Sequence, residues 1–114
     1  TLPLSDRLWN HEMFLPITTL APVNDISEAI QLANDVNYGL TAGFYGRDAE
    51  VKYFFDHIEA GVAYANRPQG ATTGAWPGFQ PFGGWKASGS SGKNAGGRYY
   101  LPLYMHEQVQ TRVR

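Results

Sequence analysis

The sequence predicts an α/β fold, and three observations support this prediction. Short apolar stretches rich in β-branched side chains alternate with stretches whose apolar residues recur three or four positions apart. The order along the chain is strand, helix, strand, helix, strand, and the connections are short. Strands that are linked through helices in this way form parallel sheets with right-handed crossovers. We therefore expect a βαβαβ unit built on a parallel sheet.

The first strand and the first helix are predicted from the N-terminal third. Residues 17–23 are mostly β-branched or apolar, and Pro22 lies near the end, where a missing amide donor is tolerated. The first helix should begin at Asp25, which with Glu28 has the form of a capping box. One apolar stripe then follows at helical spacing: Ile26, Ala29, Ile30, Ala33 and Val36.

The second helix shows the clearest periodicity in the chain and lies between two further strands. A strand is expected over residues 40–45, after which Asp48 should cap the helix. Gly61 is expected to end this helix in a left-handed conformation, and residues 62–65 should form the third strand. The apolar positions of the helix are Val51, Phe54, Phe55 and Ile58.

The composition limits the possible functions. A chain of 114 residues fits one domain, and a net charge of −1 gives no positive field for nucleic acid. No apolar run is long enough to span a bilayer, so we expect a soluble, cytoplasmic protein without a nucleic-acid or membrane partner. With no cysteine, the chain has no disulfide, thiolate metal site or cysteine nucleophile. It begins at Thr1 and not at methionine, which suggests a piece of a longer protein.

A glycine-rich loop that contains large aromatic residues spans residues 73–89. Glycines allow close backbone approach and aromatics build walls, so this is a shaped loop. From composition alone, a self-packed surface loop and a binding loop are equally good interpretations. Its position after the third strand favours binding, because ligands of open parallel sheets lie beyond the carboxyl ends of the strands.

Other candidate motifs are weaker. The glycines before Lys93 fit neither a phosphate-binding loop nor a dinucleotide fingerprint. His11, His57 and His106 are too dispersed for a metal site, so we expect no bound metal. Glu12 lies in a loop beside apolar residues; a solvated surface carboxylate is the simpler interpretation, and a functional carboxylate is the alternative.

The end of the chain alternates between apolar or threonine side chains and polar ones. Val109, Thr111 and Val113 share one face of a predicted strand over residues 108–114. A lone terminal strand of this kind needs a sheet to join, either in its own chain or in a neighbouring one.

Three motifs together resemble the C-terminal part of the aldehyde dehydrogenase superfamily. Residues 12–16 resemble its Glu-x-Phe-Gly-Pro motif, with Leu15 in place of the glycine. Residues 34–43 resemble its Asn-containing Tyr-Gly-Leu segment, and residues 81–89 resemble its Pro-Phe-Gly-Gly-x-Lys-x-Ser-Gly signature. Within the superfamily, residues 73–82 most resemble the 1-pyrroline-5-carboxylate (glutamate γ-semialdehyde) dehydrogenases.

The resemblance implies a cofactor and a substrate. NAD⁺, or alternatively NADP⁺, would accept a hydride from a small aldehyde that carries an amino-acid end. The cofactor-binding residues implied by the resemblance are Glu12, which would bond the nicotinamide ribose, Phe14 beside it, and Leu40. The substrate-binding residues implied are Gly74 and Ala75, whose backbone amides would hold the carboxylate, and Phe82, which would pack on the aliphatic part.

The resemblance also implies that catalysis is shared with residues outside this chain. The family attacks the aldehyde with a cysteine thiolate, and this sequence has no cysteine. Residues 1–107 would be the C-terminal portion of the catalytic domain, inactive alone, and residues 108–114 an oligomerisation strand that joins identical subunits. A non-catalytic α/β binding or assembly module, which uses the glycine-rich loop as a partner surface, is the alternative.

Overall fold

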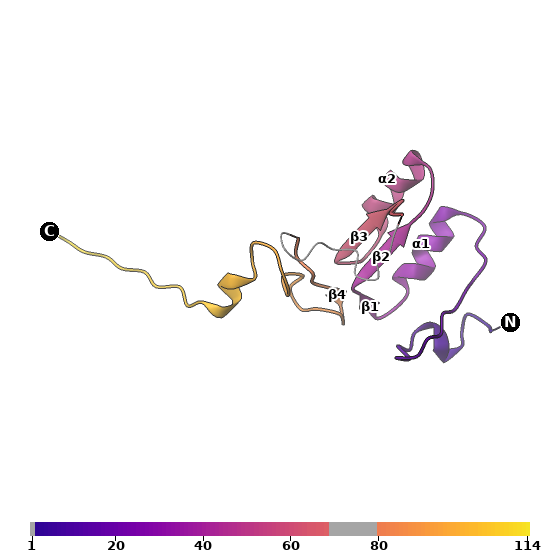
Figure 1. The fold of residues 1–114 in the computed structure, drawn as a ribbon, viewed down its shortest axis with the longest axis horizontal. Coiled ribbons are helices and arrows are strands. Elements are labelled where there is room, and N and C mark those ends of the chain that lie inside the picture. The colour runs from indigo at the N-terminus through magenta and orange to yellow at the C-terminus, as the bar shows by residue number, and fades with distance from the viewer. Residues whose placement is uncertain (1, 69–79) are drawn as a thin grey trace.

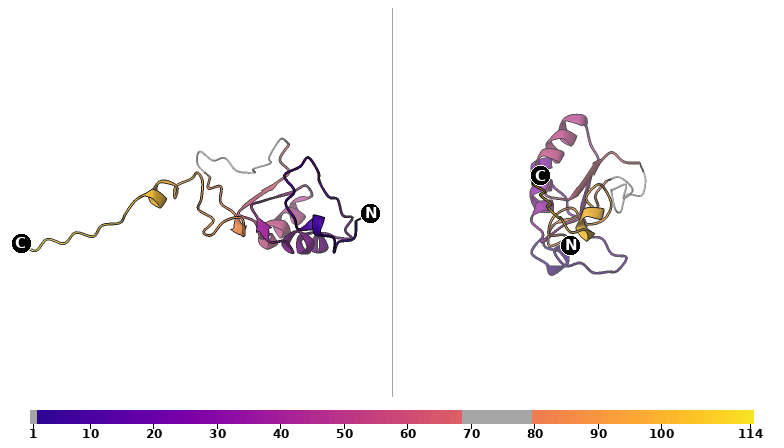
Figure 2. Two further views of the ribbon diagram at one scale, coloured as in Figure 1. Left: turned by 90° about the horizontal axis from the view of Figure 1, so that it is seen from below. Right: turned by 90° about the vertical axis from the view of Figure 1, so that its left-hand side faces the viewer.

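The chain folds into a small α/β unit with a long C-terminal extension (Figures 1 and 2). The structure is a computed structural model and describes residues 2–68 and 80–114. Its extents of 74 × 32 × 24 Å reflect the C-terminal segment, which leads away from the α/β unit. No helix among the described residues has both the length and the apolar character needed to cross a membrane.

The centre of the fold is a pair of parallel strands. β2 (Thr41–Phe44) pairs with β3 (Val62–Ala65) in a register that joins Thr41 to Val62 and Phe44 to Ala65. Helix α2 (Asp48–His57) connects the two strands, and α1 (Ile26–Asn34) lies beside α2. The parallel pairing predicted for the second and third strands is therefore confirmed (Figure 1).

Short elements flank this unit. The two-residue strands β1 (Tyr38–Gly39) and β4 (Trp85–Lys86) pair antiparallel. The 3₁₀ turns η1 (Arg7–Trp9) and η2 (Leu101–Tyr104) lie near the two ends of the chain. The antiparallel pair places the turn that follows β4 beside the segment between α1 and β1. There the N–H of Ala87 donates to the carbonyl of Asn37 at 2.9 Å.

The prediction of a strand over residues 17–23 is wrong. This segment carries no strand in the structure, and Ile17 and Leu20 are 59% and 87% exposed. The N–H of Ile17 donates to the carbonyl of Leu15 at 2.7 Å, which forms a tight turn in place of a ladder. High β-propensity requires a neighbouring strand to be realised. Within the described part of the chain, the sheet that contains β2 and β3 therefore has two strands and not the predicted three.

Helix α1 begins where the capping signal predicts. The Asp25 carboxylate accepts a hydrogen bond from the N–H of Glu28 at 2.9 Å. The Glu28 side chain accepts in turn from the N–H of Asn24 at 2.7 Å, one residue before the cap. Of the predicted stripe, Ile30 is buried and Ile26 packs against the same core, whereas Ala33 is exposed.

Helix α2 differs from the prediction at both ends. Its N-cap is Arg47 and not Asp48, because the Glu50 carboxylate accepts from the backbone N–H of Arg47 at 3.0 Å and pairs with its guanidinium at 2.9 Å. The helix ends at His57, and its C-cap residue, Ile58, is extended. Gly61 does not take the predicted left-handed conformation. It is required instead for close approach to Gly83, whose carbonyl oxygen would lie 1.8 Å from an added Cβ.

The core is small and lies between the helices and the parallel strands. Ile30, Phe54 and Ile58 form its buried cluster. The ring of Phe44 stacks on that of Phe54 with centroids 5.3 Å apart. The periodicity of the second helix identified Phe54 and Ile58 correctly, whereas Phe55 is 48% exposed.

The structure describes part of the glycine-rich loop and all of the segment predicted as a terminal strand. Residues 73–79 of the loop lie outside the described residues, and after residue 80 an antiparallel bridge joins Phe82 to Ala95. Residues 105–114 are extended and exposed, with no strand assigned. The pairing of residues 108–114 and the division of the chain at residue 107 therefore stay predictions.

The Arg47–Glu50 pair predicts how stability depends on pH. The hydrogen bond from the Arg47 side chain lowers the pKa of Glu50 from 4.5 to about 2. Because the folded-state pKa is depressed, the stabilisation is fully present above pH 4.5 and is lost as the pH falls towards 2. We expect Glu50→Gln to reduce the slope of unfolding free energy against pH in this window, as measured by urea unfolding.

The matched control for this experiment is Glu107→Gln, in the exposed C-terminal segment. The pKa of Asp56 is also lowered, by its hydrogen bond from Lys52, and this contribution remains in both variants. An unchanged slope in Glu50→Gln, or an equal change in the control, would contradict the assignment.

Candidate functional site

The first candidate site is a cavity of about 480 Å³ between the N-terminal segment and the β1–β4 pair. One wall comes from Glu12 and the three residues before it, and a second from residues around β1, including Tyr38 and Leu40. The third wall is the turn after β4, formed by Ala87 and Ser88. Glu12 and Leu40, predicted from the sequence to border one cleft, therefore line the same cavity.

Phe14 does not join them in this cavity. Its side chain is 91% exposed, and its backbone has a φ of 46°. It lines a neighbouring cavity of about 430 Å³, which Glu12 also borders. A non-glycine residue at positive φ is uncommon, and here it directs the chain into the turn at Leu15.

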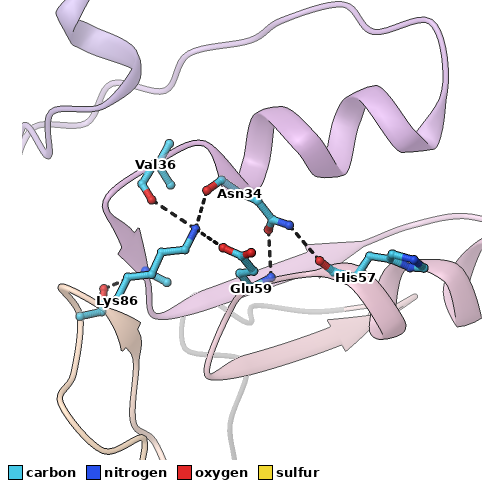
Figure 3. Close-up of polar contacts among 7 residues, drawn as sticks. Asn34, Val36, His57, Glu59 and Lys86 are labelled. Carbon is cyan, nitrogen blue, oxygen red and sulfur yellow. Dashed lines mark hydrogen bonds and ion pairs between the residues drawn. The ribbon is translucent and has the colours of Figure 1, made fainter.

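Hydrogen bonds hold the turn of Ala87 and Ser88 in place. The Ser88 hydroxyl accepts from the N–H of Gly39 at 3.1 Å, and the Ala87 N–H bonds to Asn37 as described above. The ammonium group of Lys86 ties the same turn to the end of α1 and to Glu59 (Figure 3). Contacts to the segment around β1 and to Glu59 thus hold this wall of the cavity in place.

A second cavity, of about 620 Å³, lies along β3 and the chain that follows it. It is lined by residues 61–68 together with Gln80 and Pro81. It therefore includes the carboxyl end of a parallel strand, where ligands of α/β sheets are expected. Gly74 and Ala75, predicted to bind substrate, lie outside the described residues, which break off at residue 68 and resume at 80 beside this cavity. Phe82 is half-buried, pairs with Ala95, and does not line the cavity.

Comparison with known protein families decides which class of protein this is. The model of the aldehyde dehydrogenase family matches residues 2–109. The chain belongs to the aldehyde dehydrogenase family.

Several relatives of this aldehyde dehydrogenase chain share one described activity. A 1-pyrroline-5-carboxylate dehydrogenase of Staphylococcus aureus (strain JH1) is 37% identical over 98% of this chain and 21% of its own length. The chain thus spans about a fifth of the curated relatives it matches. Two solved structures are also similar. A 1-pyrroline-5-carboxylate dehydrogenase from Thermus with bound NAD has a TM-score of 0.80 and 36% identity, covering 90% of this chain and 19% of that one. Proline utilization A from Bdellovibrio bacteriovorus has a TM-score of 0.81 and 34% identity, covering 92% and 11%.

The three aldehyde dehydrogenase motifs come together in space. The first cavity takes Glu12 from the first motif, Tyr38 and Leu40 from the second, and Ala87 and Ser88 from the third. The three motifs occupy residues 12–16, 34–43 and 81–89, and they meet only in the folded chain. The folded motifs therefore build one site.

Sequence reasoning missed the polar residues that support this site. Asn34 lies in the second motif and Lys86 in the third, whereas Glu59 belongs to none of the three motifs. A lysine next to a turn of small residues gives no local sign of its partners. The only available signal was its place within the third motif.

Proposed function

We propose that this chain is the C-terminal portion of the catalytic domain of an NAD-dependent aldehyde dehydrogenase that oxidises glutamate γ-semialdehyde to glutamate. The observation that carries the proposal is the convergence of three family motifs on one cavity of about 480 Å³. The relatives named 1-pyrroline-5-carboxylate dehydrogenase support the choice of substrate. Residues 108–114 would join identical subunits by strand pairing.

The residues of the first cavity suit the ribose end of a dinucleotide. Glu12 is exposed at the cavity, and a carboxylate accepts hydrogen bonds from ribose hydroxyls. Tyr38 and Leu40 supply apolar surface opposite it. Phe14, on the other side of Glu12, would flank the same group. Bound NAD⁺ supplies the acceptor for the hydride that leaves the aldehyde carbon. NADP⁺ is the alternative cofactor.

The substrate would lie towards the second cavity. Gly74 and Ala75 would present backbone amides to its carboxylate, because neither residue has a large side chain to block an anion. Phe82 would pack on the aliphatic carbons between the carboxylate and the aldehyde. The cavity of about 620 Å³ beside Gln80 leaves room for a ligand of this size.

The attacking thiolate would come from outside these residues, because the chain contains no cysteine. Overall, the aldehyde, water and NAD⁺ would give the carboxylate, NADH and protons. The role of this chain is to bind, to orient and to exclude water. On its own we expect it to be inactive.

The first test is to sequence the DNA on both sides of the codons for these 114 residues and to translate it in the same reading frame. We expect it to encode a cysteine-bearing segment and a nucleotide-binding half. The protein it encodes should form NADH with glutamate γ-semialdehyde faster than with propanal, an aldehyde that lacks the amino-acid end. An open frame without those segments, or equal rates with the two aldehydes, would contradict the proposal.

Titration of NAD⁺ into the 114-residue chain is the control. We expect no tight binding, because this chain supplies only part of the dinucleotide site. Submicromolar affinity corresponds to a binding free energy on the order of 8 kcal/mol or more. Such an affinity would show that the chain holds a complete site by itself. That result would overturn the fragment model while leaving the family unchanged.

A further inference from the structure

Lys86 combines an unusual backbone conformation with a partly buried side chain. Its φ of 52° lies in the left-handed region, which lysine rarely adopts. Its side chain is only 23% exposed, whereas Lys52, also in an ion pair, is 78% exposed. Surrounding contacts must maintain such a conformation.

The Lys86 ammonium group uses all three of its donors (Figure 3). It contacts the carbonyl oxygen of Asn34 at 2.5 Å and that of Val36 at 3.3 Å. It also pairs with the Glu59 carboxylate at 2.8 Å. The Asn34 carbonyl belongs to the last residue of α1, where helix carbonyls lack partners and the helix dipole favours a cation, and the Val36 carbonyl lies just beyond the helix.

Asn34 extends this set of contacts to the end of α2. Its side-chain oxygen accepts from the N–H of Glu59 at 2.9 Å, and its side-chain NH₂ donates to the carbonyl of His57 at 2.8 Å (Figure 3). The end of α1, the chain after α2 and strand β4 are thereby joined at one point. The cavity wall formed by Ala87 and Ser88 follows directly after Lys86.

We propose that Lys86 is a positioning residue that holds the turn of Ala87 and Ser88 against β1 and so sets the third wall of the Glu12 cavity. It acts through two hydrogen bonds, from Ala87 N–H to Asn37 and from Gly39 N–H to the Ser88 hydroxyl. Lys86 itself does not line the cavity. The proposal goes beyond the proposed function, because it concerns the shape of the cavity whichever ligand binds there.

The absence of cysteine in the chain makes a clean test possible. Lys86→Cys introduces a single thiol, and alkylation with 2-bromoethylamine in urea converts it to a thioether analogue of lysine with the same ammonium group. After refolding, hydrogen exchange measured by NMR should show that the amides of Ala87 and Gly39 lose protection by about tenfold or more in the unmodified variant. Alkylation should restore it.

Two comparisons show that the effect is local. The amide of Val62, which bonds to the Leu40 carbonyl at 3.0 Å, should keep its protection in every sample. Lys52→Cys, carried through the same treatment, should leave the protection of the Ala87 and Gly39 amides unchanged. Full protection of Ala87 and Gly39 in folded, unmodified Lys86→Cys, or loss that alkylation does not restore, would overturn the proposal.

Glu59→Gln provides a second variant if Lys86→Cys does not fold. It keeps the size of the side chain and removes the negative charge that faces the ammonium group. We expect a smaller loss of protection at the same two amides, with Val62 unchanged. Protection equal to that of the original chain at Ala87 and Gly39 would contradict the positioning role.

Discussion

Replacement of Phe54 with alanine is expected to destabilise the α/β unit by about 3–5 kcal/mol. The side chain is 3% exposed and stacks on Phe44, and it joins Ile30 and Ile58 in the core cluster. Among the described residues, the buried hydrophobic core consists of Ile30, Phe54, Ile58 and Val62. So small a core has no second cluster to compensate for a cavity, so thermal unfolding followed by circular dichroism should show a large fall in the midpoint.

Phe55→Ala is the matched control, because it removes the same ring one position away on the same helix. Phe55 is 48% exposed, and its ring lies 5.4 Å from that of Phe54. We expect a loss below about 1 kcal/mol. Comparable losses in the two variants would contradict the role of core packing, because alanine has a higher helix propensity than phenylalanine and removal of an exposed ring should cost little.

The helices and the parallel pair could be predicted because their signals are local. Asp25 and Glu28 lie three positions apart, so the start of α1 is encoded within one turn. The spacing of Phe54 and Ile58 similarly identifies the buried face of α2. Residues 62–65 are bounded by Gly61 and Asn66, and β3 has these bounds in the structure.

The errors all depend on contacts that are distant in sequence or on side-chain competition. Residues 17–23 have the composition of a strand but find no partner among the described residues. Asp48 is a good capping residue, yet Arg47 holds the cap position because Glu50 reaches back to it. Gly61 is of a residue type that commonly ends helices, but its actual role depends on Gly83, which comes from another part of the chain.

The candidate site was predictable only through resemblance to known motifs. Glu12 and Leu40 were assigned to one cleft on that basis, and the cavity contains both. Periodicity and propensity carry no information on a contact such as that between Lys86 and Asn34, which are 52 residues apart. The geometry of the site therefore required the folded chain.

Gly61→Ala should be strongly destabilising, because the added methyl group would meet backbone that cannot rotate away. The ideal Cβ position lies 1.8 Å from the carbonyl oxygen of Gly83, 2.8 Å from its carbonyl carbon and 3.0 Å from the Cα of Gly84. Overpacking of this kind costs about 1–3 kcal/mol, and more where backbone must shift. We expect urea unfolding to show a loss at the upper end of this range.

Gly46→Ala separates a backbone clash from the general effect of adding a methyl group. There the added Cβ would lie 2.5 Å from the ring of Phe44, a side chain that can adjust by rotation. Its cost should therefore be smaller than that of Gly61→Ala, and equal losses would contradict the argument. Since Gly61 and Pro81 line the same cavity of about 620 Å³, separation of β3 from the chain at Gly83 would also deform the candidate substrate site. The close approach of two glycines thus links the stability of this unit to the shape of the site.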